Sequence, residues 1–130
     1  MIAVDTNILI RFLTQDDMTQ YKKSLQLIKK HQIYIPTSVI QETEWVLRFA
    51  YNYNVNQIAN ALSALFGLEN VHIDNPNKMA QVIQWHKKGF DFSDALHLSY
   101  CDNKIDSLYT FDKKFVKRAQ KLNSCEVKTP

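Results

Sequence analysis

Short segments rich in β-branched residues alternate along this chain with longer segments of helical period. Strands are predicted at residues 2–4, 33–35, 71–73 and 107–110, with a fifth, edge strand at 125–127. Helices are predicted at residues 8–13, 20–30, 39–50, 57–66, 76–88, 94–103 and 113–121. Thr37 or Ser38 is predicted to begin the third of these helices, and Ser38-x-x-Gln41 matches a capping box. This alternation predicts an α/β fold with a small, mostly parallel sheet of four to five strands, flanked by about seven helices.

The composition fits one domain at residues 1–130. A chain of 130 residues with 45% hydrophobic residues can bury a core. Only two glycines and three prolines are present, which argues against flexible linkers. The formal net charge of +3 is compatible with a nucleic-acid partner but does not require one.

The cysteines and the N-terminal segment indicate the compartment. Cys101 and Cys125 form no C-x-x-C motif, and the apolar N-terminal segment lacks the basic region of a signal peptide. No apolar segment approaches the length of a membrane span. We therefore expect a cytoplasmic protein that does not enter a membrane.

Four acidic residues lie at predicted strand-to-helix junctions: Asp5, Glu42, Asp94 and Asp112. Each has a structural explanation by itself, because Asp is a preferred helix N-cap and acids near a helix N-terminus interact well with the helix dipole. The set is harder to explain in this way. The carboxyl ends of parallel strands share one edge of a sheet, so we expect several of these carboxylates to converge there.

Converging carboxylates point to a bound cation. Like charges within a few ångströms raise one another's pKa and cost stability, and a cation offsets that cost. A ligand set made only of oxygen atoms favours Mg²⁺ or Mn²⁺. The four histidines are scattered and show no zinc motif.

Four segments carry a resemblance to a known family: residues 4–9 (VDTNIL), 42–48 (ETEWVLR), 91–96 (DFSDAL) and 110–115 (TFDKKF). In this order and spacing the chain resembles PIN-domain proteins, specifically the toxins of the virulence-associated (VapC-type) group. The resemblance implies a Mg²⁺- or Mn²⁺-dependent endoribonuclease that is the toxin of a type II toxin–antitoxin pair. It also implies a homodimer, an RNA substrate and a small antitoxin protein as partner.

The same resemblance assigns roles to individual residues. The catalytic acids are then Asp5, Glu42, Asp94 and Asp112. Asp5 and Asp94 are the expected metal ligands, with Glu42, Asp112 and Asp91 as possible further ones, and the supporting polar residues are Thr6, Asn7 and Thr110. Asp91 also has a sufficient role as a helix cap, so both explanations stay open for it.

Basic residues cluster in the last predicted helix: Lys113, Lys114, Lys117, Arg118 and Lys121. Lys113, Lys117 and Lys121 share one helical face, which suits either contact with RNA phosphates or an ordinary solvated surface. Arg11 is a second candidate for RNA contact. Trp45 and Phe49 are expected in the core or in a dimer contact rather than as base-stacking residues.

Two other functions remain open. One is a non-catalytic module of the same fold that binds RNA or a protein partner, which the complete acid set disfavours. The other is an aspartyl-phosphate enzyme or receiver domain, which also places Asp at a strand end. Asp5-Thr6-Asn7 lacks the second acid two residues on that a phosphatase of this kind uses.

Overall fold

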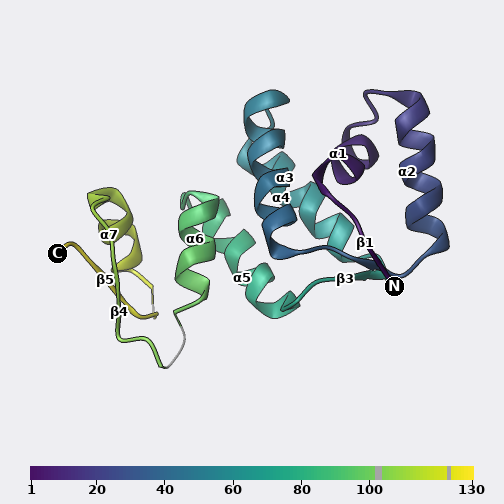
Figure 1. Ribbon diagram of the computed structural model, residues 1–130. Helices are drawn as coiled ribbons and strands as arrows, with labels where there is room; N and C mark the ends of the chain where they lie inside the picture. Colours follow the sequence, from purple (N-terminus) through teal and green to yellow (C-terminus); the bar gives the residue numbers. More distant parts are fainter. Residues whose placement is uncertain (102–103, 123) are drawn as a thin grey trace. The chain divides into compact units, whose positions relative to one another are not determined.

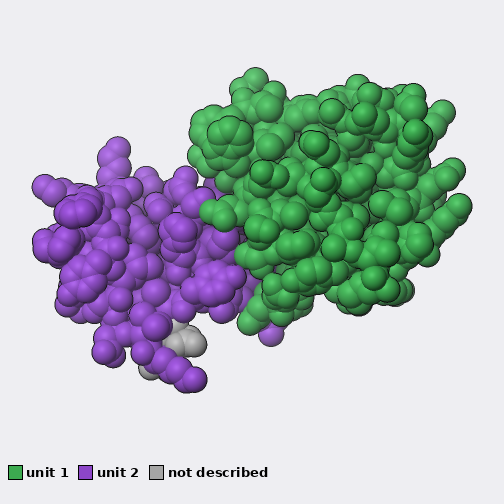
Figure 2. Space-filling view, in the orientation of Figure 1, with its two compact units in different colours: residues 1–76 green, residues 77–130 purple. Residues whose placement is uncertain are grey.

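The computed structural model describes residues 1–101, 104–122 and 124–130, which form two compact units, residues 1–76 (unit 1) and 77–130 (unit 2) (Figure 2). The elements follow one another as labelled in Figure 1: β1 Ile2–Ala3, α1 Thr6–Thr14, α2 Met18–Lys30, β2 Ile33–Tyr34, α3 Thr37–Ala50, α4 Val55–Phe66, β3 Val71–His72, α5 Pro76–Lys87, α6 Phe92–Ser99, β4 Ser107–Tyr109, α7 Lys113–Ala119 and β5 Glu126–Lys128.

Unit 1 is built on a parallel sheet with the strand order β1-β2-β3. Ile2 pairs with Ile33, and Ile33 pairs with Val71. Two helices precede each return to the sheet: α1 and α2 before β2, then α3 and α4 before β3. The central strand is the most buried, since Ile33 and Ile35 have no exposed surface. The carboxyl ends of all three strands therefore meet at one edge, where α1 and α3 begin.

Unit 2 contains most of α5, together with α6, α7 and the parallel pair β4-β5. Helix α7 connects β4 to β5, and Leu108 pairs with Val127 in the register. Aromatic rings make much of the core of this unit. Phe90 meets Phe115 edge to face at 6.2 Å, and Phe92 is fully buried. This core fixes the beginnings of α6 and α7, which carry the candidate acids of unit 2.

The α/β class is confirmed, with seven helices and five strands within the described residues. The strands form a three-stranded and a two-stranded parallel sheet rather than one sheet of four to five strands. Helix α6 ends at Ser99, earlier than predicted, and residues 102–103 of the predicted helix lie outside the described residues. Among the described residues, every helix is too short or too polar to cross a membrane.

The predicted capping box of the third helix is wrong. Pro36 is the N-cap of α3, and no side chain caps this helix end. Pro36 already holds the extended backbone conformation that an N-cap requires, so the helix starts before Ser38. A complete capping box is found instead on α4, where Asn54 and Gln57 each accept a hydrogen bond from the other's backbone N–H at 2.8 Å.

Candidate active site

Asp5 follows β1 and is the N-cap of α1. Its Oδ1 accepts a hydrogen bond from the backbone N–H of Ile8 at 3.4 Å, and the residue is exposed. A bond of this length at an exposed site holds the carboxylate weakly. Asp5 therefore caps its helix, as the structural explanation requires, and its carboxylate also stays accessible from solvent.

Thr6 connects α1 to the candidate acid Glu42 on α3. The Thr6 hydroxyl donates a hydrogen bond to Oε1 of Glu42, across 36 positions of sequence. Thr6 is 6% exposed, whereas Glu42 is exposed. The buried hydroxyl thus orients an exposed carboxylate at the edge of the sheet. Asn7, the next residue, is exposed.

A second glutamate on α3 has a different role. Glu44 is 1% exposed, and Nε and Nη2 of Arg48 donate to its two oxygens at 2.9 and 3.1 Å. Both oxygens of Glu44 are therefore engaged in an ion pair with two hydrogen bonds. Of the two glutamates in this helix, only Glu42 presents its carboxylate to solvent.

Asp74 is an acid at this sheet edge that sequence reasoning missed. It follows β3, and its oxygens accept hydrogen bonds from the Tyr34 hydroxyl at 2.7 Å and the Thr37 hydroxyl at 3.3 Å. These contacts join the ends of β2 and β3 to the first residue of α3. The signal was present in the sequence, because Asp74 follows a predicted strand and precedes a helix that starts at Pro76, as Asp5 precedes α1.

Asp91 and Asp112 are both helix N-caps in unit 2. Asp91 accepts from the backbone N–H of Asp94 at 3.2 Å, and Asp112 accepts from those of Lys114 at 2.9 Å and Phe115 at 3.2 Å. Thr110 supports Asp112, because its Oγ1 accepts the Asp112 backbone N–H at 3.0 Å. Capping is therefore a structural role of Asp91, and it fixes the positions of these carboxyl groups.

Asp94 lies in the first turn of α6 and is half-buried. Burial raises the pKa of its carboxyl group, and the negative charges of Asp91 and Asp112 raise the pKa further. His97 and Arg118 act in the opposite direction. The charged form of Asp94 is thus disfavoured where it stands, and a bound proton or cation would relieve it.

The donor set suits a hard divalent ion, since it consists of carboxylate oxygens and crowds negative charge at Asp94. Within the described ranges, however, no three His, Cys, Asp or Glu side chains form a group that could hold an ion. Mg²⁺ commonly binds through one or two carboxylates and completes its shell with water and substrate phosphate. The residues present fit this open type of site rather than a closed protein cage.

Positive charge gathers beside Asp112 on α7 and the residues that follow it. Lys114, Lys117, Arg118 and Lys121 line a hollow of about 270 Å³, and all four are exposed. Of the three lysines predicted to share a helical face, Lys117 and Lys121 line the hollow and Lys113 does not. A hollow lined by four cations is suited to bind phosphate groups.

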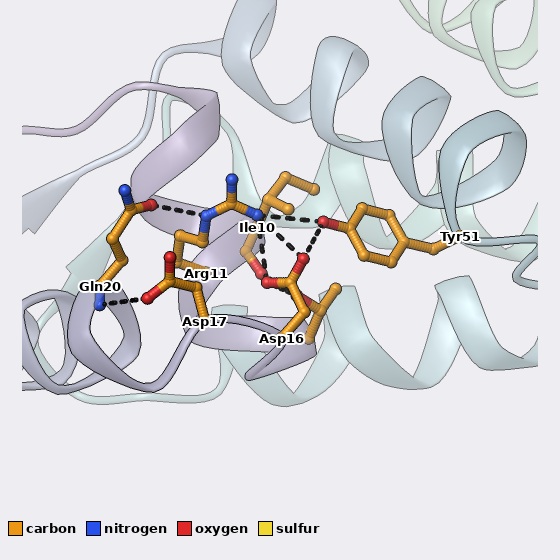
Figure 3. A network of polar contacts seen from close by, with 7 residues as sticks. Ile10, Arg11, Asp16, Asp17, Gln20 and Tyr51 are labelled. Atoms are coloured by element: carbon orange, nitrogen blue, oxygen red, sulfur yellow. Dashed lines mark hydrogen bonds and ion pairs between the residues drawn. The ribbon is translucent and has the colours of Figure 1, made fainter.

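Arg11 is held in a network within unit 1, which Figure 3 shows. Its Nη1 contacts both oxygens of Asp16 at 3.0 and 3.1 Å, and its Nε donates to Gln20 at 2.6 Å. Tyr51, the C-cap of α3, donates to Asp16 as well. This hydrogen bond lowers the pKa of Asp16, and contacts with Thr14 and Arg11 add to the effect. The guanidinium group of Arg11 therefore serves to join α1, α2 and α3.

Trp45 and Phe49 were expected either in the core or in a dimer contact, and a place in the core is wrong. They are 56% and 58% exposed, and their rings contact each other with centroids 5.1 Å apart. Arg48 lies over the Phe49 ring at 4.5 Å. Both side chains form an exposed aromatic ridge on α3, and their role in a dimer contact stays a prediction.

Comparison with known proteins gives one family match. The model of the PIN domain family matches residues 2–121. Among solved structures, the chain is similar to that of Mycobacterium tuberculosis VapC20, described as a toxin that cleaves the sarcin–ricin loop. The identity is 18%, the match covers 88% of this chain and 92% of that one, and the TM-score is 0.46. No curated protein sequence matches this chain.

Proposed function

Because the chain belongs to the PIN-domain family, we propose that it is a metal-dependent endoribonuclease whose nuclease domain spans residues 1–130. The observation that supports this most is the half-buried position of Asp94 in the first turn of α6, where burial and then the charges of Asp91 and Asp112 raise the pKa of its carboxyl group. This arrangement disfavours the charged carboxylate and therefore costs stability. It is what a site needs if it is to bind a divalent cation.

The proposal assigns the metal-ligand role to Asp5 and Asp94 and the metal identity to Mg²⁺ or Mn²⁺. Glu42, Asp112 and Asp91 are the further candidate ligands. When bound, the ion supplies polarisation of the scissile phosphate and a bound water of lowered pKa. The chain's own residues prepare the site: Thr6 orients Glu42, and Thr110 fixes the backbone at Asp112.

Substrate binding is assigned to the basic hollow of Lys114, Lys117, Arg118 and Lys121. Its cations attract the RNA backbone and hold a phosphate next to the helix start at Asp112. Lys113 adds to the positive field from the first position of α7. Arg11 has no part in this assignment, because its guanidinium group is bound to Asp16, Gln20 and Tyr51.

We further propose that the protein is the cytoplasmic toxin of a toxin–antitoxin pair, acts as a homodimer and is inhibited by a small antitoxin protein. The four motifs at residues 4–9, 42–48, 91–96 and 110–115 support this, because they match the VapC-type pattern in order and spacing. The competing function is a PIN-fold module that binds RNA or a protein without cutting RNA.

Cleavage of single-stranded RNA by the purified protein tests the proposal. We expect cleavage with Mg²⁺ or Mn²⁺, none with EDTA, and none from Asp5→Asn. Asp17→Asn is the matched control, because Asp17 also caps a helix, with its Oδ1 accepting from Gln20 at 3.0 Å, but does not follow a strand. Asn keeps the cap in both variants.

Equal cleavage by the parent and both variants would refute the assignment of Asp5. Binding of RNA by the parent without any cleavage in either metal would favour the non-catalytic module instead.

A further inference from the structure

Phe111 is the most exposed large hydrophobic side chain among the described residues. It is 86% exposed and lies between Thr110 and the candidate acid Asp112. A phenylalanine ring in solvent contributes nothing to packing of the fold. An exposed apolar ring beside a polar site is instead a feature of binding surfaces.

The backbone on both sides of Phe111 is firmly held. The Thr110 N–H donates to the carbonyl of Lys128 on β5 at 3.0 Å, and the Asp112 N–H donates to Oγ1 of Thr110 at 3.0 Å. Asp112 in turn caps α7 through two hydrogen bonds. The ring is thus mounted on an ordered turn, so little conformational entropy of the backbone is lost when a ligand binds it.

The charges that follow Phe111 along the chain indicate which ligand suits the ring. Four cations of the adjoining helix and its end line the basic hollow: Lys114, Lys117, Arg118 and Lys121. An exposed aromatic ring and a cluster of cations on one short segment are the combination that binds single-stranded nucleic acid, because bases stack on the ring while cations bind the phosphates. A duplex does not suit the ring, since its bases are stacked on one another.

We propose that Phe111 is a base-stacking residue for single-stranded RNA, with phosphates of the same strand held in the basic hollow. The inference rests on the proposed function for the nature of the substrate. It adds a specificity-determining contact: an unpaired base is required next to Asp112. Purines stack more strongly than uracil because their ring systems are larger, so purine-rich strands bind more tightly.

The aromatic ridge of Trp45 and Phe49 supplies a contrast. Phe49 is also exposed, but its ring contacts Trp45 and has Arg48 over it at 4.5 Å. The charge of Arg48 is in turn bound by the buried Glu44. The ring of Phe49 is thus already engaged by Trp45 and Arg48, which makes Phe49 the matched control.

The test measures binding to the metal-free protein, so that cleavage does not interfere. Fluorescence anisotropy in EDTA would use labelled ten-nucleotide oligo(A), oligo(U) and a fully paired RNA duplex. We expect Phe111→Ala to weaken oligo(A) binding about 5- to 150-fold, the range for loss of one stacked base. Phe111→Trp should bind at least as well as the parent, and Phe49→Ala should bind like the parent.

A fourth variant separates stacking from simple apolar contact. Phe111→Leu keeps an apolar side chain but has no aromatic face, so it should resemble Phe111→Ala. Because the ring is exposed, all three variants at this position should melt at the temperature of the parent, which checks their folding.

Three results would overturn the proposal: no binding of single strands by the parent, parental binding by Phe111→Ala, or parental binding by Phe111→Leu. Unchanged RNA binding in Phe111→Ala would leave the ring as a contact for a protein partner. The nuclease proposal fails separately. A parent that binds through Phe111 but never cleaves refutes only the nuclease, whereas cleavage and binding unchanged in Phe111→Ala refute only the stacking role.

Discussion

In unit 1 the carboxylates of Glu42 and Asp74 accept hydrogen bonds from hydroxyl groups, whereas in unit 2 the carboxylate of Asp94 is repelled by two other carboxylates. Hydrogen bonds to a charged carboxylate favour the charged form, and like charges disfavour it. Glu42 and Asp74 therefore have hydroxyl partners within unit 1. At Asp94, burial and two neighbouring carboxylates raise the pKa, and a bound cation would offset this cost.

The largest expected effect is that of Asp94→Asn on catalysis. Loss of a metal ligand should lower the cleavage rate on the order of 10³-fold, since metal-ion stabilisation contributes several kcal/mol to the transition state. The same variant should melt at a higher temperature than the parent in EDTA, because repulsion from Asp91 and Asp112 is removed. RNA cleavage and thermal melting measure the two effects.

Opposite changes in activity and stability distinguish a strained ligand from a structural residue. If Asp94→Asn lowers both, Asp94 is part of the helix start and the contrast between the units is wrong. Asp5→Asn in the same assays tests the contrast between the two units further. We expect it to lose as much activity as Asp94→Asn but to gain less in melting temperature.

Mg²⁺ should stabilise the parent more than either variant. A ligand that binds only the folded state raises the melting temperature by mass action. The shift between EDTA and Mg²⁺ should be largest for the parent and smaller for both Asp5→Asn and Asp94→Asn. A shift of the same size in all three proteins would mean that neither residue is a metal ligand.

Thr6→Val probes the hydrogen bond that characterises unit 1. The change removes the hydroxyl that orients Glu42 and should lower cleavage about tenfold and stability by about 1 kcal/mol. Thr6→Ser is the control, because it keeps the hydroxyl and should retain most of the activity. If Thr6→Val keeps the parental activity and Thr6→Ser loses it, packing of the methyl group rather than the hydrogen bond explains the role of Thr6.

The stability of the metal-free protein should depend on pH through Asp94. Its pKa is raised in the folded state by burial and by Asp91 and Asp112, so the folded protein binds a proton that the unfolded chain has already lost. The contribution of Asp94 is therefore most favourable below its ordinary pKa of 3.8 and is lost as the pH rises through its folded pKa.

Urea unfolding in EDTA from pH 3.5 to pH 7 measures this dependence. The difference in free energy of unfolding between Asp94→Asn and the parent should grow in favour of the variant as the pH rises. A constant difference over this range would show that Asp94 has an ordinary pKa.

The smallest expected effect concerns the two cysteines of unit 2, Cys101 and Cys125. Burial, and then contact with Cys101, raises the pKa of the Cys125 thiol from 9.0 to about 11. Alkylation of Cys125 at pH 9 should therefore be slower than that of an exposed thiol, because the thiolate is the reactive form. Cys101→Ala should raise the alkylation rate of Cys125, but not to that of an exposed thiol, since the burial of Cys125 remains. An unchanged rate would mean that Cys101 does not affect the pKa of Cys125.

Much of the candidate site could be predicted because its backbone contacts are local. Asp5, Asp91 and Asp112 each accept from a backbone N–H two or three residues later. A preference of this kind depends on the residue type and its neighbours, so it can be read from a single sequence. Asp74 was missed although it stands in the same local pattern after a strand.

What the sequence left open depended on where elements pack. Trp45 and Phe49 have the spacing of a buried pair, and only the placement of α3 leaves both rings exposed, so a place in the core is wrong. The position of Arg11 in the sequence does not show that Tyr51 and Asp16 engage its guanidinium group. Nor does helical spacing show that Lys114, Lys117, Arg118 and Lys121 line one hollow. RNA contact by these basic residues stays a prediction.

The sequence by itself determined the α/β order of the elements and the acids at the starts of the helices. Both follow from interactions between residues close together in the sequence, which do not depend on how the elements pack. Only the tertiary structure decided that Thr6 orients Glu42, that Tyr34 engages Asp74 and that Asp94 is crowded. Apart from the local pair of Asp91 and Asp94, these interactions join residues far apart along the chain, and they exist only where packing of the core brings the elements together.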